Sequence, residues 1–330
     1  MITKRTGMTP GYAPRPAYPG QVQELRTDEL TGACAIVAPG RATRPMVFSP
    51  AAATSTTTPP DCPFCPTHEA MTPSEVARVG GGERDAPGWQ VRVVPNLYPI
   101  VGADDDGVRG AHEVLILSPD HGGQFDALPL DAATVALSTL RDRAAYQLGA
   151  GFVHAQPLVN HGRASGASIE HPHAQLVALA FTPPHVDAIL TRFANAGRHL
   201  VIDAIDNARA KSCVVRDADA ITWCPPGATS PYLVRIALAT PRARFDEATD
   251  QEIRALTEAL QDALRRFHAT LGDFAYNVVL NTAPRDDPRP FHLWIDIVPR
   301  IGVYGGFEMG TGVWVNPALP ETVAERLRDA

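Results

Sequence analysis

At residues 168–175 the chain reads Ser-Ile-Glu-His-Pro-His-Ala-Gln. Alternate residues of an extended segment point to the same face, so His171, His173 and Gln175 can converge on one site. Pro172 fixes a backbone angle and removes an N–H donor, which leaves the two imidazole rings little freedom. A neutral imidazole can bind a metal ion or attack an electrophile near pH 7. The segment therefore predicts a strand that carries a reactive or metal-binding site, and two buried core histidines are the alternative.

The composition is that of an ordinary globular protein, with 330 residues of which 45% are hydrophobic and 20% charged. This length suffices for two domains or for one duplicated domain. The formal net charge of −7 argues against a nucleic acid as the main partner. No apolar run is long enough to span a membrane. Residues 1–21 are predicted to be a flexible arm because of their Pro and Gly content, and they are not expected to be a secretory signal because no apolar stretch follows Lys4 and Arg5.

The five cysteines do not form the pattern of a disulfide framework, so a cytoplasmic location is predicted. Cys62 and Cys65 form a Cys-x-x-Cys pair, which can hold one zinc ion. A redox pair is the alternative, but no thioredoxin-like helix is predicted after it. The two further ligands are predicted among the histidines, with His121 and His171 as the first choice and His68 and His112 as competitors. A closed site of two cysteines and two histidines has no open position, so the zinc would be structural.

Two stretches of the chain repeat the same order of elements. The first has strands at 90–94 and 112–117, a helix at 129–148 with Asp131 as its predicted cap, and strands at 153–159 and 174–180. The second has a strand at 233–239, a helix at 249–271, and strands at 276–280 and 292–298. Asn160 and His171 are eleven residues apart, and so are Asn281 and His292. We therefore expect an α+β fold of two duplicated halves, with a mostly antiparallel sheet and helices packed on it.

The two halves are predicted to span residues 22–182 and 183–330, and they are not chemically equal. Where the first half has His171, His173 and Gln175, the second half has His292, Trp294 and Asp296. We therefore expect the first half to carry the chemistry and the second half to supply scaffold or substrate contacts.

Across about residues 22–326 the chain resembles the galactose-1-phosphate uridylyltransferases and the related nucleotide-sugar phosphorylases of the histidine-triad superfamily. The Cys-x-x-Cys pair together with the octapeptide is the specific part of the resemblance. The segments that carry it are residues 30–32, 41–45, 62–65, 91–99, 118–121, 168–175 and 305–312.

The resemblance implies two fused histidine-triad-like halves, usually in a homodimer, and ping-pong transfer of a nucleoside monophosphate between a nucleoside diphosphate sugar and a sugar 1-phosphate. It implies that His173 is the nucleophile and that zinc is held by Cys62, Cys65, His121 and His171. The other implied site residues contact substrate: Ser168 and Gln175 at the phosphates, Asn160 beside the nucleophile, Asn96 at the nucleoside, Phe307 and Glu308 at the sugar, and Arg41 and Arg44 from the partner subunit.

The chemistry is also consistent with the residues themselves. A neutral imidazole needs no deprotonation before it attacks a phosphorus atom. Gln175 and Ser168 can donate hydrogen bonds to the phosphate oxygens. Gly162 and Gly166 allow backbone N–H groups to approach an anion closely.

Two alternatives remain open at this stage. Uridylyltransferases usually have Asn-Asp in the nucleoside loop, whereas this chain has Asn96-Leu97. The loss of that carboxylate puts a preference for uracil in doubt. The Gly-Thr-Gly run at 310–312 and the absence of a lysine before residues 305–312 resemble the phosphorylase branch, so the first alternative is an ADP-glucose phosphorylase-like enzyme that uses inorganic phosphate as the acceptor. The second alternative is a non-catalytic, zinc-bearing nucleotide-binding protein, against which the intact His173 and Gln175 argue.

Overall fold

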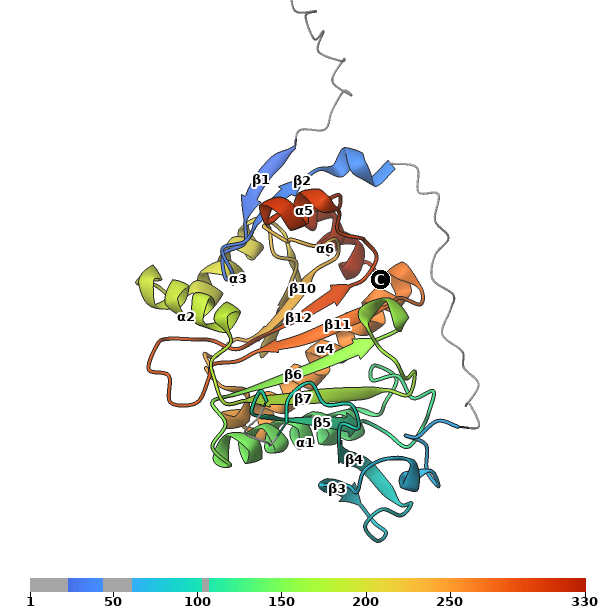
Figure 1. Cartoon of the computed structure of the whole chain (residues 1–330). Coiled ribbons are helices and arrows are strands. Elements are labelled where there is room, and N and C mark those ends of the chain that lie inside the picture. The colour runs from blue at the N-terminus through green and yellow to red at the C-terminus, as the bar shows by residue number, and fades with distance from the viewer. Residues whose placement is uncertain (1–22, 44–60, 103–106) are drawn as a thin grey trace, which may run out of the picture.

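The computed structural model describes residues 23–43, 61–102 and 107–330 (Figure 1), so the predicted arm at 1–21 lies outside it. Ten strands form one sheet in which all neighbouring strands are antiparallel. Their spatial order is β3 (Ala77–Gly80), β4 (Trp89–Pro95), β5 (Gly110–Ile116), β7 (His173–Leu179), β6 (His154–His161), β11 (Tyr276–Asn281), β12 (Trp294–Pro299), β10 (Val234–Leu238), β9 (Ala220–Trp223) and β8 (Val214–Arg216).

The strand order has an approximate two-fold symmetry about its centre, because equivalent strands of the two repeats occupy equivalent places on either side. β6 and β11 pair at the centre, with His161 opposite Tyr276 and Leu158 opposite Val279. Outward from them lie β7, β5 and β4 on one side and β12, β10 and β9 on the other. In each half a long helix precedes the central strand, α1 (Leu130–Gly149) before β6 and α4 (Asp250–Leu271) before β11. The predicted duplication and the predicted α+β class are confirmed, whereas the residue limits of the two halves stay a prediction.

α1 and α4 pack against each other and cover the same side of the sheet, behind it in the view of Figure 1. The packing of α4 follows from its sequence, because its apolar residues recur at helical spacing and form one face. The buried residues of this face include Ile253, Leu256, Leu260, Leu264 and Phe267. The helix begins with a capping box, in which the side chains of Thr249 and Glu252 each accept a hydrogen bond from the other's backbone N–H.

The cap predicted for α1 is wrong. Pro129 occupies the cap position and makes no side-chain cap bond. Asp131 lies inside the first turn, where its carboxylate accepts a hydrogen bond from Arg254 of α4 at 2.8 Å. The aspartate therefore joins the two helices instead of starting one.

Several elements fall outside the repeated pattern. Two helices, α2 (Pro184–Ala196) and α3 (Leu200–Ala210), connect the halves, and α5 (Gly306–Thr311) and α6 (Pro320–Arg328) lie near the C-terminus. A separate sheet joins β1 (Glu24–Thr27) and β2 (Cys34–Val37) to β13 (Val313–Asn316), which runs parallel to β2. The segment predicted as a strand from residue 292 becomes β12 only at Trp294.

The sheet face opposite the helices carries the octapeptide's functional side chains. Paired residues of antiparallel strands share a face, and Gln175 pairs with Val114 on one side and Leu158 on the other. Residues 62–65 fold back over this face and form a second, small core. Its members are Cys62, Phe64, Cys65, Trp89, Val94, Val114 and Ile116. Among the described helices none is both long and apolar enough to cross a membrane.

Candidate active site and metal centre

Cys62, Cys65, His121 and His171 come together from three separate segments of the chain, and all four are buried. Their ligand atoms lie within 4.8 Å of one another. The Cys65 sulfur is 3.4 Å from Nδ1 of His121 and 3.6 Å from Nδ1 of His171. The corners of a tetrahedron with metal–ligand bonds of about 2.0–2.3 Å are separated by about this much. The cluster can therefore hold a metal ion.

The surroundings prepare this cluster for a cation. The Nε2–H of His171 donates to the Ser118 carbonyl at 2.8 Å, which leaves Nδ1 free to face the two sulfurs. Burial lowers the pKa of His171 to about 4, so its ring is neutral at pH 7. Burial and the neighbouring Cys62 raise the pKa of the Cys65 thiol to about 11 in the metal-free protein. A bound cation would reverse this last effect, because it stabilises thiolates.

The two competing histidines make other contacts. Nδ1–H of His68 donates to the backbone carbonyl of Cys62 at 2.7 Å, so this ring holds the turn in place. His112 lies on β5, where its Nε2 is 2.9 Å from Oε1 of Gln175. Neither ring belongs to the metal cluster.

His173 opens β7 and is only 7% exposed. Its Nδ1–H donates to the carbonyl of His171 at 2.8 Å, which leaves the lone pair on Nε2. Burial lowers the pKa of His173, so the ring stays neutral at pH 7. The Phe64 ring packs edge-on against it, with the centroids 5.3 Å apart. A neutral, fixed imidazole with one free lone pair is the arrangement that a nitrogen nucleophile needs.

The other residues predicted beside His173 lie on β6 and in the turn that follows it. Oδ1 of Asn160 accepts a hydrogen bond at 2.7 Å from Asn277, which also donates to the Ser165 carbonyl. The sequence pattern missed Asn277, because it reaches Asn160 only through the pairing of β11 with β6. Gly166 adopts a left-handed conformation at φ 93°, and Ser168 is exposed close by.

Gly162 is required at its position. Its φ is 76°, and a Cβ there would lie 2.9 Å from the Cβ of Ala275. Glycine is the residue that adopts this conformation without strain and leaves room for the neighbouring strand.

A small cavity of about 40 Å³ lies between the sheet and the helices α1 and α4, and Asn160, Gly162 and His173 are among the residues that line it. Its polar lining comes from Gln124, Asn160, His161, Glu170, His171 and His173, and the remainder is mainly apolar. His161 stacks on Tyr276 at 4.6 Å.

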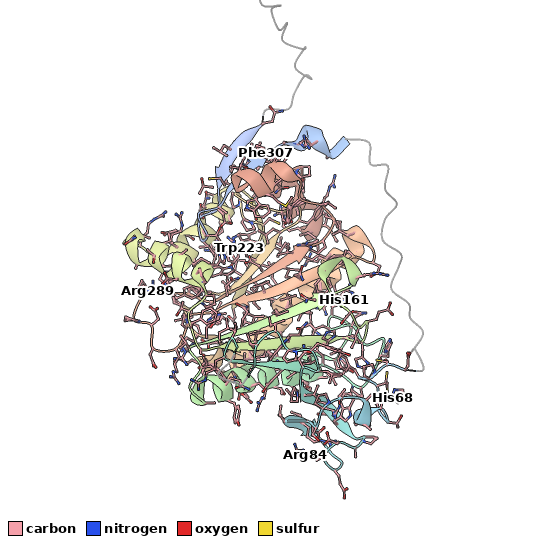
Figure 2. The ribbon with its side chains drawn as sticks, in the orientation of Figure 1. His68, Arg84, His161, Trp223, Arg289 and Phe307 are labelled. Carbon is pink, nitrogen blue, oxygen red and sulfur yellow. The ribbon has the colours of Figure 1, made fainter. Side chains whose placement is uncertain are left out.

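Arg41 and Glu308 line a different groove, of about 530 Å³, which shares no lining residue with the cavity beside His173. Tyr304, Arg300 and Arg326 are among its other walls. Glu308 accepts a hydrogen bond from the Gly305 N–H at 2.9 Å and so caps α5. Phe307 is half exposed on α5, well above His161 in the view of Figure 2. Within one chain these residues are not brought to His173, and Arg44 lies outside the described residues.

The matching position in the second half is filled by an ion-pair network. Asp296, which aligns with Gln175, accepts hydrogen bonds from Arg235, Asn281 and Trp294 at 2.8–2.9 Å. Arg235 also pairs with Asp28 at 2.8 Å. His292 is fully buried, and its ring packs edge-on against that of His199, with the centroids 5.4 Å apart. The part of the second half that the structure describes holds no cluster comparable to Cys62 and its partners.

Comparison with known proteins gives a consistent picture. A family described as a domain of unknown function, DUF4921, matches residues 134–330. An ADP-glucose phosphorylase of Arabidopsis thaliana is 29% identical over 94% of this chain and 93% of its own length. A galactose-1-phosphate uridylyltransferase of Thermotoga maritima is 22% identical over 93% of this chain and 98% of its own length.

Solved structures agree with these sequence relatives. A crystal structure of an ADP-glucose phosphorylase from Arabidopsis thaliana with bound ADP-glucose superimposes with a TM-score of 0.82 at 28% identity, over 94% of this chain and 99% of that one. A uridylyltransferase structure has a TM-score of 0.71 at 24% identity over 93% and 98% of the two chains, which shows a shared fold.

Proposed function

Because the chain belongs to the DUF4921 family and to the wider family of galactose-1-phosphate uridylyltransferases and related nucleotide-sugar phosphorylases, we propose that it transfers a nucleoside monophosphate through His173. The observation that carries the proposal is the hydrogen bond from Nδ1–H of His173 to the His171 carbonyl. It leaves Nε2 of a neutral ring as the nucleophile.

The reaction has two balanced steps. Nε2 attacks the phosphorus next to the nucleoside in a nucleoside diphosphate sugar. A P–N bond forms, the P–O bond to the second phosphate breaks, and sugar 1-phosphate leaves. In the second step an acceptor oxygen attacks the same phosphorus and the P–N bond breaks. The His171 carbonyl stabilises the positive charge that the ring acquires between the two steps.

Two acceptors fit this site. A sugar 1-phosphate makes the enzyme a hexose-1-phosphate uridylyltransferase-like transferase. Inorganic phosphate makes it an ADP-glucose phosphorylase-like enzyme that releases a nucleoside diphosphate. The second is favoured by the similarity to the Arabidopsis ADP-glucose phosphorylase along nearly the whole chain and by the missing carboxylate after Asn96.

Zinc fits the metal cluster, because two thiols and two imidazoles at tetrahedral spacing suit it. Cys62, Cys65, His121 and His171 would fill all four positions, so the ion would fasten the 62–65 turn to β7 and supply no reactive ligand. None of the five cysteines forms a disulfide, which supports a reducing compartment such as the cytoplasm.

The separate groove around Arg41 and Glu308 supports a homodimer. In such a dimer, Arg41 and Glu308 of one subunit would complete the substrate site around His173 of the other subunit. A nucleotide sugar and a phosphate or sugar phosphate are the proposed ligands.

Intact-mass measurement tests the proposal directly. The protein is incubated with UDP-glucose or with ADP-glucose, and an acid-labile uridylyl or adenylyl adduct is expected. His173→Ala should abolish the adduct while the protein still folds and binds metal. Release of nucleoside diphosphate on adding inorganic phosphate would select the phosphorylase, and release of a new nucleotide sugar on adding a hexose 1-phosphate would select the transferase. A folded wild-type protein that forms no adduct with either sugar nucleotide contradicts the proposal.

A further inference from the structure

We propose that His112 is a positioning residue, which fixes the side-chain amide of Gln175 so that its NH2 group, and not its oxygen, faces the reacting phosphate. The inference rests on the proposed function of the His173 site, which it deepens. It assigns a task to a histidine that is neither a metal ligand nor the nucleophile.

His112 and Gln175 lie on the same face of adjacent strands. β5 and β7 pair so that His112 is opposite Val177 and Val114 is opposite Gln175. Residues paired in this way share a face, and diagonal neighbours on it are within reach of long side chains. His112 is 8% exposed, so its ring is enclosed and its hydrogen bonds are not exchanged freely with water.

The protonation of the ring follows from its backbone contact. The N–H of Ile100 donates to Nδ1 of His112 at 3.3 Å. A nitrogen that accepts this bond carries no proton. In an imidazole ring the proton must then be on Nε2.

This proton sets the orientation of Gln175. Nε2 of His112 is 2.9 Å from Oε1 of Gln175, so the ring donates to the amide oxygen. The amide NH2 of Gln175 has no hydrogen bond to any other described residue, and it is left to donate to a ligand. A reversed amide would put an N–H against an N–H at His112 and an oxygen against the phosphate, and both contacts are repulsive.

The same ring constrains Asn96. Its Nδ2 lies 3.1 Å from Nε2 of His112 and competes with Gln175 for that nitrogen, because an amide NH2 group can only donate. The backbone bond from Ile100 decides the competition: with the proton on Nε2 the ring donates to Gln175, whereas with the proton on Nδ1 it would accept from Asn96. Oδ1 of Asn96 is occupied by the N–H of Tyr98 at 2.8 Å. One ring therefore links residues 96–100 to Gln175.

Two substitutions of His112 separate the hydrogen bond from the ring's bulk. His112→Phe keeps a ring but loses the donor, and His112→Gln keeps an N–H donor. Single-turnover formation of the nucleotidyl-His173 adduct should slow about 100-fold in His112→Phe, which is the loss typical of one misplaced transition-state donor. Binding of the sugar nucleotide should change far less, and His112→Gln should recover most of the rate. Melting temperature and metal content show whether each variant is folded.

A double-mutant cycle with Gln175→Ala distinguishes positioning from general damage. If His112 acts through Gln175, then His112→Phe costs little further rate in the Gln175→Ala background. His154→Phe is the matched control, because this buried histidine of β6 also faces a glutamine oxygen, that of Gln156 at 3.4 Å, but the NH2 group of Gln156 already donates to the backbone carbonyls of Pro157 and Leu280. It is expected to change stability without slowing adduct formation in the folded protein. Equal rate losses from His112→Phe in both backgrounds would overturn the inference.

A second readout does not depend on catalysis. In 15N-labelled wild-type protein, the two ring nitrogens of His112 should show the tautomer with the proton on Nε2. A proton on Nδ1 would refute the inference even if the adduct forms. Conversely, a wild-type protein that forms no adduct would refute the proposed function, while the tautomer would still decide how Gln175 is oriented.

Discussion

Two histidines separated by one proline have opposite tasks because each ring is anchored through a different nitrogen. His171 donates from Nε2 to the Ser118 carbonyl and turns Nδ1 toward the cysteines. His173 donates from Nδ1 to the carbonyl of His171 and leaves Nε2 free. The carbonyl that anchors the proposed nucleophile thus belongs to a residue of the metal cluster, so an ordered cluster helps to keep the nucleophile in place.

The buried His292 predicts a pH dependence of stability. Burial lowers its pKa to about 4, below the ordinary value of about 6.5. The unfolded chain therefore binds this proton more readily, and stability is full above about pH 6.5 and falls as the pH drops toward 4. Between pH 7 and pH 5 this one residue should cost about 2 kcal/mol of unfolding free energy.

Urea denaturation at the two pH values measures this effect. His292→Phe should lose about 2 kcal/mol less than wild type between pH 7 and pH 5. His185→Gln, which removes an exposed histidine of α2, serves as the control. Equal losses for wild type and His292→Phe would show that His292 is not the residue responsible.

At the scale of elements, the turn at 62–65 holds its position through the metal cluster and the small core around it. Phe64, Trp89, Val114 and Ile116 alone form a modest apolar cluster. A structural zinc ion contributes on the order of 10 kcal/mol to folding in small metal sites. The metal should therefore matter more for this turn than its apolar contacts do.

Cys62→Ser is expected to lower the melting temperature strongly and to release metal, with a smaller loss of adduct formation per folded molecule. Chelation of the wild-type protein should reproduce the drop in melting temperature. Cys34→Ser, at a half-exposed cysteine of β2 outside the cluster, is the control and should keep its metal. A variant that melts like wild type but loses its chemistry would contradict a structural role.

At the scale of the whole molecule, the duplicated halves form one continuous sheet, but only the first half carries the metal-ligand cluster and the proposed nucleophile among the described residues. The cavity beside His173 and the groove beside Arg41 and Glu308 have no residue in common. The second half's equivalent of the site is occupied by Arg235 and its two carboxylate partners. In the proposed homodimer, Arg41 and Glu308 would therefore act at the substrate site of the partner subunit.

Subunit mixing tests this arrangement. His173→Ala and Arg41→Ala should each be poorly active, whereas a re-equilibrated equal mixture should regain about a quarter of the wild-type activity, because half of the dimers then hold one intact site. Each variant re-equilibrated with itself is the control. A mixture no more active than the sum of its parts, with dimers confirmed by sedimentation, would place Arg41 outside the partner's site.

The sequence alone determined the parts of this protein that depend on residue type and local spacing. The octapeptide, the Cys-x-x-Cys pair and the repeated order of strands and helices predicted the α+β duplication and the four clustered metal-ligand residues. These predictions succeed because strand and helix periodicity is local, and because few residue types bind a soft cation. α2 and α3 were missed, since they have no counterpart in the repeat.

Only the tertiary structure decided which groups face one another. The pairing of β5 with β7 brings His112 to Gln175, and the pairing of β11 with β6 brings Asn277 to Asn160. It also decided that His68 holds a turn and that Asp131 joins two helices. Such contacts join residues distant in sequence, and strand register and ring protonation, which fix them, are set by the assembled sheet and not by any one segment.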